Sequence, residues 1–472
     1  MPGGAATTIG NSWLMLAVLL LGQFMCIIDV LVVNVAMPSI AASLHASGAS
    51  LQLVVGGYTI AYAMLLITGA RLGDRYGRRR TYLAGVGVFT TASLACALAP
   101  DSQALIGFRL VQGAGAAVLV PQVFSIIQLT FTGAARARAL SAYAVVLSAG
   151  AVVGLVLGGV VVNANLFGTG WRPVFAINVP IGIVLALLVP RLVPADTPAA
   201  QPAKVDLAGL AAAAGSVLLI VMPLVLGHEL GWPAWCFGSI AAGVALAAGF
   251  VLTERAVAAR GGDPLLNLGV LRARALPSGL ATLSLTQVAY GGLLFAYTLH
   301  LQAGLGQSAL RAGLSYLPMV VVFGLTGYHW RRLPAAARQV IVPAGLAVGA
   351  VAYLSLAAGL HDNTGALTWA GLAGMGLGLG LCVSPLMTQS LAHVPAARAA
   401  DASGLLTTIA QLGQLLGVAA IGSVYLSRAG SPGHAAASAA AMSVTACWLA
   451  ALSAAGLLMA ALMVRAARGR RP

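Results

Sequence analysis

The chain has 472 residues, of which 60% are hydrophobic and 7% are charged, and its formal net charge is +15. A soluble protein of this length needs far more charged side chains to cover its surface, so the composition excludes an ordinary soluble protein. The mean hydropathy of +0.95 is typical of a protein built from membrane-spanning helices.

Apolar stretches of about twenty residues, the length that crosses a bilayer as a helix, follow one another along the chain. The first six fall within residues 12–190, which we expect to form an N-terminal six-helix bundle. Their limits are 12–36, 50–70, 81–99, 103–128, 138–162 and 174–190.

A polar, Pro-containing linker at 191–206 leads into two additional spans within 207–254, at 207–227 and 234–254. A second, basic linker at 255–275 precedes a C-terminal six-helix bundle within 276–465. The pattern therefore predicts an all-α integral membrane protein with 14 transmembrane helices. The last six spans are 276–299, 309–329, 339–360, 367–389, 403–425 and 441–465.

The basic residues are distributed unevenly over the connections. If the N-terminus is cytoplasmic, all 25 Lys and Arg residues except Arg109, Arg172, Arg311 and Arg428 fall in cytoplasmic segments. The positive-inside rule then places both termini in the cytoplasm, and the net charge becomes a topology signal with attraction to anionic lipids. We therefore expect contact with membrane lipids and no binding of nucleic acid.

Two charged residues, Asp29 and Arg109, lie well inside predicted spans. An embedded charge is costly in a bilayer, so each is a candidate functional residue. Burial favours a neutral carboxyl group, whereas a nearby arginine favours the carboxylate. A group held between these effects can load and release a proton.

The segment after the second span reads GARLGDRYGRRR over residues 69–80. It resembles the signature loop of the major facilitator superfamily, with matches at Asp74, Arg75, Gly77, Arg78 and Arg79. The resemblance implies a conformational gating role, in which the loop locks one access state. A plain basic loop explains the arginines but not an acid flanked by glycines.

Further segments resemble the fourteen-span drug:proton antiporter branch of this superfamily. Residues 109–117, RLVQGAGAA, match its fourth-helix motif, in which Arg109 implies proton coupling and Gly113 close helix packing. Residues 28–38, IDVLVVNVAMP, match its first-helix motif, with Asp29 as the proton-coupling acid. Residues 171–182, WRPVFAINVPIG, resemble the start of its sixth helix.

The fifth span carries GAVVGLVLGG at residues 150–159, which resembles the antiporter motif of the family. Gly150, Gly154 and Gly158 share one helix face and, with Gly159, suit close helix packing. Leu155 stands where the family motif has proline. This departure weakens an assignment of antiport that rests on the motif alone.

No catalytic or metal site is expected. Most of the seven histidines, including His300, fall in connections or at helix ends without metal-ligand spacing, and no Walker loop is present. The five cysteines lie in spans and are expected to be small buried hydrophobes. Candidate substrate-cavity residues, each equally explained by hydrogen bonding between helices, are Asn34, Tyr58, Tyr62, Gln112, Gln287 and Tyr290.

The residues and the resemblance together predict a bacterial cytoplasmic-membrane protein, monomeric and without cofactor. It would use the proton gradient to export a small, largely apolar compound, such as an antibiotic, and so confer resistance. Alternatives are a proton-coupled importer or a facilitator of a metabolite. A non-transporting membrane receptor is a further alternative, from a different functional class.

Overall fold

The computed structural model describes residues 9–165, 168–195, 207–227, 230–260, 268–360, 365–392, 394, 399–430 and 434–468. Within these residues the chain forms helices and no strand. The linker predicted at 191–206 lies largely outside the described residues, as does the middle of the one at 255–275.

The first half of the molecule, called the N half here, consists of α1 to α7. Each apolar stretch predicted in this region falls on one of its helices or on a consecutive pair. The bounds are α1 Ile9–Leu44, α2 Gly48–Tyr76, α3 Arg78–Ala97, α4 Ser102–Thr130, α5 Gly133–Ala164, α6 Pro173–Ala176 and α7 Asn178–Leu192.

Two further helices, α8 (Leu207–Leu226) and α9 (Ala234–Ala259), form a hairpin that precedes the second half, called the C half. In the C half, two predicted spans are interrupted: one at Tyr316, and one by a π-helical turn that ends at Ile421. Its elements are η2 Leu268–Arg272, α10 Leu276–Leu299, η3 His300–Gly304, α11 Ala309–Ser315, α12 Leu317–His329, η4 Trp330–Arg332, α13 Ala335–Gly359, α14 Ala366–Leu391, α15 Ala399–Leu416, η7 Gly417–Ile421, α16 Gly422–Ala429 and α17 Ala435–Arg468.

Helix length and composition identify a multi-pass membrane protein. Among the described residues, 11 helices are long and apolar enough to cross a bilayer. Two shorter apolar helical segments, Val153–Ala164 and Ala211–Leu226, accompany them.

A local signal in the sequence also marks the start of α4. Asp101 caps this helix by accepting a hydrogen bond from the Ala104 amide at 2.8 Å.

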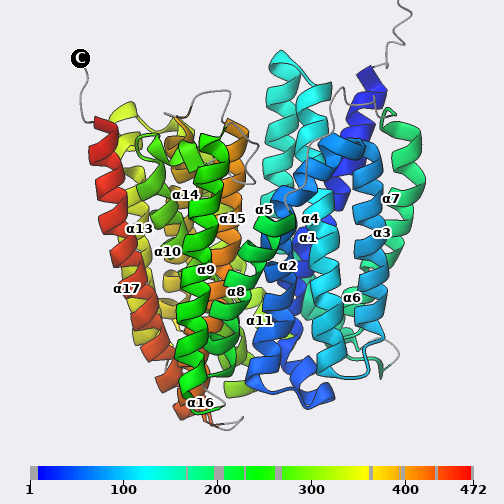
Figure 1. The fold of residues 1–472 in the computed structure, drawn as a ribbon. Helices are drawn as coiled ribbons and strands as arrows, with labels where there is room; N and C mark the ends of the chain where they lie inside the picture. Colours follow the sequence, from blue (N-terminus) through cyan, green and yellow to red (C-terminus); the bar gives the residue numbers. More distant parts are fainter. Residues whose placement is uncertain are drawn as a thin grey trace, which may run out of the picture.

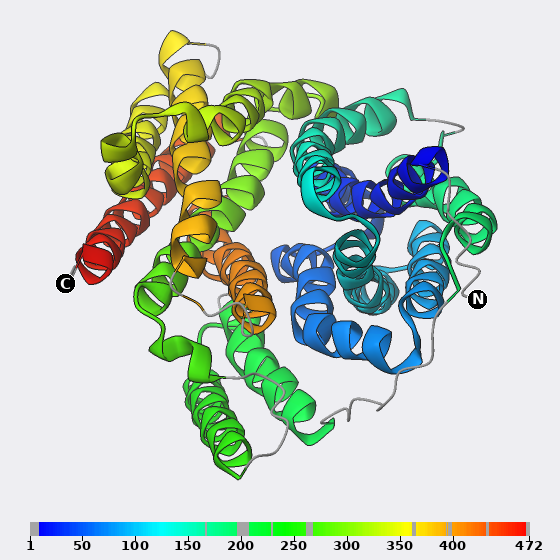
Figure 2. The same cartoon turned by 90° about the horizontal axis from the view of Figure 1, so that it is seen from above.

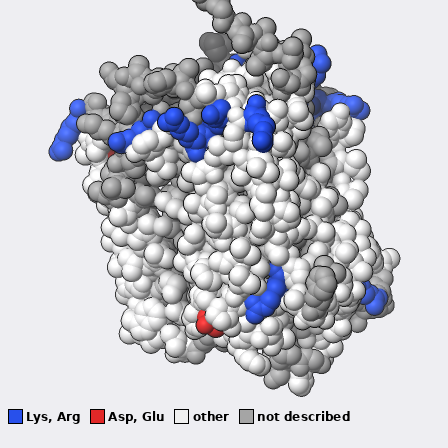
Figure 3. Space-filling model, turned by 90° about the vertical axis from the view of Figure 1, so that its right-hand side faces the viewer, with Lys and Arg blue, Asp and Glu red and all other residues white. Residues whose placement is uncertain are grey.

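The helices run roughly parallel, and the first and last of them begin and end on the same side of the molecule (Figure 1). We call this side the terminal end and the opposite side the far end. Lys and Arg side chains gather in a band near the terminal end and are sparse near the far end in the face that Figure 3 shows. This one-sided charge agrees with the distribution that the sequence predicts.

The apolar cores show how the halves meet. One buried cluster contains residues of both halves, among them Val35 and Leu155 of the N half and Leu301 and Tyr425 of the C half. These residues lie toward the far end of their helices. Two other clusters lie toward the terminal end, and each is confined to a single half. Among the described residues, the halves therefore share buried apolar packing at the far end and have separate cores at the terminal end.

Specific contacts close the seam between the halves at the far end. The Gln302 side-chain amide donates to the Val35 carbonyl oxygen at 2.8 Å. The Gln52 amide donates to the Ser423 hydroxyl at 3.3 Å. Gly159 of α5 lies against Leu310 of α11, where a Cβ on the glycine would come within 2.7 Å of the Leu310 Cα. These contacts seal the two halves together on this side.

The structure changes the interpretation of the segment at 69–80. Residues 69–76 belong to the last turns of α2, so the predicted loop is reduced to Gly77, whose φ is 95°. Arg79 donates to the carbonyl oxygens of Val193 and Pro190, which ties the start of α3 to the end of α7. The side chain of Asp74 lies outside the described part of the chain, so its gating role stays a prediction.

We expect Gly77→Ala to lower the free energy of unfolding by about 1–3 kcal/mol, because a side chain is strained at this positive φ. Gly87→Ala is the matched control, since Gly87 is inside α3 with open space around it and alanine favours helix. Thermal unfolding in detergent measures both. Equal stabilities of the two variants would contradict the assignment of strain to residue 77.

Candidate proton-coupling site

The two embedded charges meet inside the N half. Arg109 on α4 contacts Asp29 on α1 through Nη1 and Oδ2 at 2.5 Å, and both side chains are about 99% buried. The arginine Nε donates to the Val54 carbonyl oxygen of α2 at 3.0 Å, which anchors the guanidinium between three helices. An ion pair removed from water in this way is costly to separate, because each buried charge would then lack an opposite charge beside it.

Amide side chains complete the environment of the carboxylate. Gln112, one helical turn after Arg109, donates to Asp29 Oδ1 at 2.7 Å and accepts from Arg109 Nη1 at 2.8 Å. Asn178, the first residue of α7, donates to the same Oδ1 at 2.8 Å. Asp29 therefore accepts three hydrogen bonds from three residues. Both oxygens of the carboxyl group therefore have donors, two on Oδ1 and one on Oδ2.

Ser93 of α3 ties the amides together. Its hydroxyl accepts from Gln112 Nε2 at 2.7 Å and from Asn178 Nδ2 at 3.4 Å, while it donates to the Phe89 carbonyl oxygen at 2.8 Å. All of these side chains are buried. The hydroxyl of Ser93 thus links α3 to the amides that hold Asp29, and the network joins side chains of α1, α3, α4 and α7.

Aromatic rings surround the cation. The Arg109 guanidinium carbon lies 4.6 Å from the centre of the Tyr58 ring and 5.6 Å from that of Phe175. Tyr58 in turn stacks on Tyr62, with ring centres 6.0 Å apart. These rings exclude water and offer their π faces to the charge. The ion pair is thus enclosed on the α2 and α6 sides.

The C half has no acid at the matching position. Gly154 of α5 lies against the α1 residue just before Asp29, and Gly417 of η7 lies in the same way against the α10 residue just before Ala289. By this equivalent packing, Ala289 is the residue of the C half that corresponds to Asp29 of the N half. By the same reasoning Gly113 of α4 corresponds to Gly376 of α14, because each meets the backbone of its neighbouring helix.

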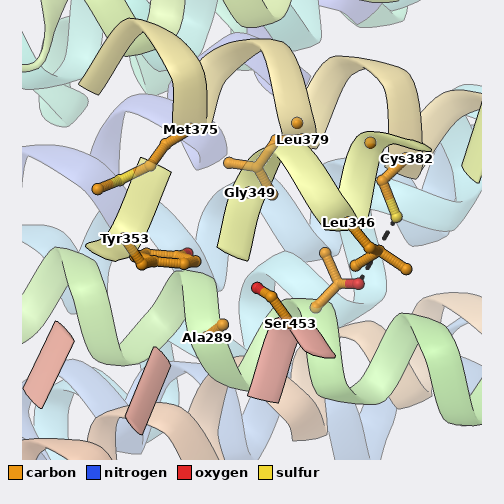
Figure 4. Close-up of a pocket in the computed structure, with 11 residues that line it drawn as sticks. Ala289, Leu346, Gly349, Tyr353, Met375, Leu379, Cys382 and Ser453 are labelled. Carbon is orange, nitrogen blue, oxygen red and sulfur yellow. Dashed lines mark hydrogen bonds between the residues drawn. The ribbon is translucent and has the colours of Figure 1, made fainter. Parts of the chain in front are cut away.

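A small cavity of about 20 Å³ lies in the C half at this matching place (Figure 4). It has room for about one water molecule. Here Ala289 and Met375 stand where the N half has Asp29 and Gln112. The two halves thus differ in chemistry at equivalent positions, with an ion pair in one and neutral side chains in the other. The lining includes Ala289, Gly349, Tyr353, Met375, Cys382 and Ser453.

The remaining predicted residues divide into two groups. Gly150, Gly154 and Gly158 lie against α1, and Gly113 lies against the Tyr58 backbone, so these glycines permit close helix contacts. Among the predicted cavity residues, Gln112 holds Asp29. Asn34 donates to Val30 of its own helix, and its other amide atom is buried without a partner.

Tyr58 and Tyr62 are buried, whereas Gln287 and Tyr290 are half-buried on α10. The substrate role of all these side chains stays a prediction.

Sequence reasoning did not identify Asn178 and Ser93 as members of the site. Asn178 lies inside the quoted segment 171–182, so a polar residue in an otherwise apolar span was the available signal. His300 was expected in a connection or at a helix end, and it lies fully buried in η3 directly after α10, where it bonds the Ser438 hydroxyl at 2.8 Å. Ser438 also bonds the Tyr425 hydroxyl, so this histidine joins helices within the C half.

A helical membrane protein with two halves sealed at one end and a buried ion pair in one half belongs to the class of transport proteins. The chain is a member of the Major Facilitator Superfamily, which residues 19–418 match. It is 37% identical to the probable actinorhodin transporter of Streptomyces coelicolor over 443 residues, covering 91% of this chain and 76% of that protein.

Two further comparisons agree. The chain is 31% identical to the tetracenomycin C resistance and export protein of Streptomyces glaucescens over 441 residues, covering 91% of this chain and 80% of that protein. The solved structure of a bacterial homolog of the human lysosomal transporter Spinster, inward-facing and occupied, has a TM-score of 0.70 at 18% identity. That likeness covers 98% of both chains and shows the fold.

Proposed function

We propose that this protein exports a small, largely apolar compound across the cytoplasmic membrane in exchange for protons that enter the cell. The observation that carries the proposal is the buried Asp29, held by Arg109, Gln112 and Asn178 inside one half of the transporter. Related proteins named for transport of actinorhodin and for resistance to and export of tetracenomycin C support the direction of transport and a role in resistance.

The proposed topology places 14 helices in the bilayer and both termini in the cytoplasm, with membrane lipids around a monomer that needs no cofactor. The basic band at the terminal end supports this orientation. The far end is then external. Among the described residues, the halves share buried clusters at that end and have separate clusters at the terminal end, so we assign the structure to a state that is closed to the outside.

In the proposed cycle, protonation of Asp29 is coupled to the opening of the contacts between the two halves at the far end. With the far end closed, charged Asp29 is satisfied by its three donors while substrate binds from the inside. When the far end opens, an external proton neutralises Asp29, weakens its attraction to Arg109 and accompanies release of the substrate. Asp29 and Val35, the seam residue bonded by Gln302, share helix α1, so a change at the acid is transmitted along one rigid element.

Import of a metabolite is the alternative that the motif at 150–159 leaves open. Leu155 replaces the motif's proline, and its carbonyl group lies against Gly313 of α11 at the sealed seam. The contact between the halves is therefore made here without proline. The direction of proton flux separates the two functions.

The test uses the purified protein in proteoliposomes that contain a pH-sensitive dye. A pH gradient is imposed across the vesicle membrane. A panel of antibiotics and lipophilic dyes is then added on the side that carries the termini. We expect substrate-triggered proton movement opposite to substrate movement. Movement of both in the same direction would establish import, and binding without any flux would establish a receptor.

A further inference from the structure

Three elements meet at the far end around one hydroxyl group. Ser423 of α16 in the C half accepts a hydrogen bond from Gln52 of α2 in the N half at 3.3 Å. The same hydroxyl lies 3.0 Å from the Leu224 carbonyl oxygen of α8 and 2.7 Å from the Ala419 carbonyl oxygen of η7, and these two acceptors share its single proton. The additional hairpin thus contacts the point where the two halves meet.

Apolar packing extends this junction along α8. The side chains of Val221 and Val225 are only 1% and 3% exposed. They belong to a cluster with residues of α2, α15 and η7. Figure 2 shows α8 and α9 together on one flank of the molecule, beside the seam. The partners in this cluster are Ala49 and Ile60 of the N half and Leu415 and Ala419 of the C half.

The second helix of the hairpin supports the first. Gly243 of α9 lies against Leu219 and Ile220 of α8, and the Ser239 hydroxyl donates to the Leu219 carbonyl oxygen at 2.8 Å. The outer face of α9, by contrast, is exposed, as at Val244 and Leu252. The hairpin is therefore one packed unit, in which α8 contacts α2 and η7 while α9 contacts η2 at the start of the C half.

We propose that α8 is a strap that holds the far end of the transporter closed. This inference rests on alternation between two access states, as in the proposed function. Opening the far end separates α2 from η7 and α16, and α8 can follow only one of them. The packing on the other side is then lost, so the strap selectively stabilises the closed state.

The proposal predicts that weakening the strap populates the open state. Spin labels at Leu98→Cys and Ser427→Cys report the far-end separation of the halves, because both residues are exposed there and lie in different halves. The background carries Cys447→Ser, which removes the exposed member of the five cysteines. Distance distributions are measured by pulsed electron resonance in lipid nanodiscs without substrate or gradient.

We expect Val221→Ala with Val225→Ala to raise the ratio of open to closed populations by about threefold to tenfold. Ser423→Ala should shift it in the same direction. The matched control, Val244→Ala with Leu252→Ala, truncates the exposed face of the same hairpin and should leave the distribution unchanged. If the double valine variant does not fold, the same shift is measured in the single variant Val221→Ala, and that result tests the proposal.

An unchanged distribution in a folded strap variant would overturn the proposal, and so would an equal shift in the control. The measurement needs no transport, so it is separable from the proposed function. A shifted distribution in a protein that shows no proton flux supports the strap and rejects proton-coupled export. Normal flux with no shift rejects the strap alone.

Discussion

We expect the Asp29→Asn variant to lose substrate-triggered proton movement in proteoliposomes. Asparagine has nearly the same shape as aspartate and keeps a polar group beside Gln112 and Asn178, but it cannot bind or release a proton near neutral pH. A decrease of at least about a hundredfold is expected, as for removal of a group that takes part directly in proton transfer. Internal dye fluorescence after addition of substrate is the measurement.

The control for this variant is Asp101→Asn. Asp101 is an exposed acid at the far end, and asparagine caps a helix as well as aspartate does. It should transport like the wild type. Proton movement at the wild-type rate in Asp29→Asn would remove Asp29 from the mechanism.

Loss of folding has to be separated from loss of coupling. Removing one partner of a buried ion pair costs about 3–5 kcal/mol, because the other charge is left uncompensated. We therefore expect Asp29→Asn to unfold at a lower temperature than the wild type. Asp29→Asn combined with Arg109→Gln removes both charges and should recover stability without recovering proton movement. Recovery of transport in this double variant would mean that the pair is structural.

The second large effect is expected for Arg109→Lys, which keeps the positive charge. Arginine contacts Val54, Asp29 and Gln112 through two nitrogens of one planar group. The single ammonium of lysine cannot reproduce these directions, so the geometry around Asp29 is lost. We expect transport to fall by about tenfold to a hundredfold, by analogy with loss of a partner that orients a functional group.

Arg311→Lys is the control for this substitution, since Arg311 is an exposed arginine near the far end. It should leave the transport rate within about twofold of the wild type, as expected for a surface change. If Arg109→Lys also transports at the wild-type rate, a positive charge at residue 109 is sufficient for transport and the planar geometry of arginine is not needed.

Much of the candidate site was accessible from sequence because a bilayer penalises charge. Asp29 and Arg109 stood out as embedded ionisable residues, and the structure brings them together. Gln112 was named as a cavity residue, but its position one turn after Arg109 directs its amide at Asp29. Neutral polar residues such as Ser93 and Asn178 carry a weaker signal, because membrane helices also use them to bond one another.

Other features depended on packing that no local pattern encodes. The segment before Gly77 reads like a loop because it is polar and rich in glycine, yet it continues α2. His300 follows an apolar span and looks like a helix end, but a π-helical turn and the small Gly304 place it against Ser438. Tertiary contacts override local propensity at both places.

The sequence by itself determined the class of protein, its long apolar helices and the side that carries the basic residues. These features follow from the free energy of transferring each side chain into a bilayer, which depends on the residue and its neighbours along the chain. The partners of Asp29, the sealed far end and the position of α8 across the seam were decided only by the tertiary structure. They arise from contacts between residues far apart in the chain, whose energies depend on shape and register.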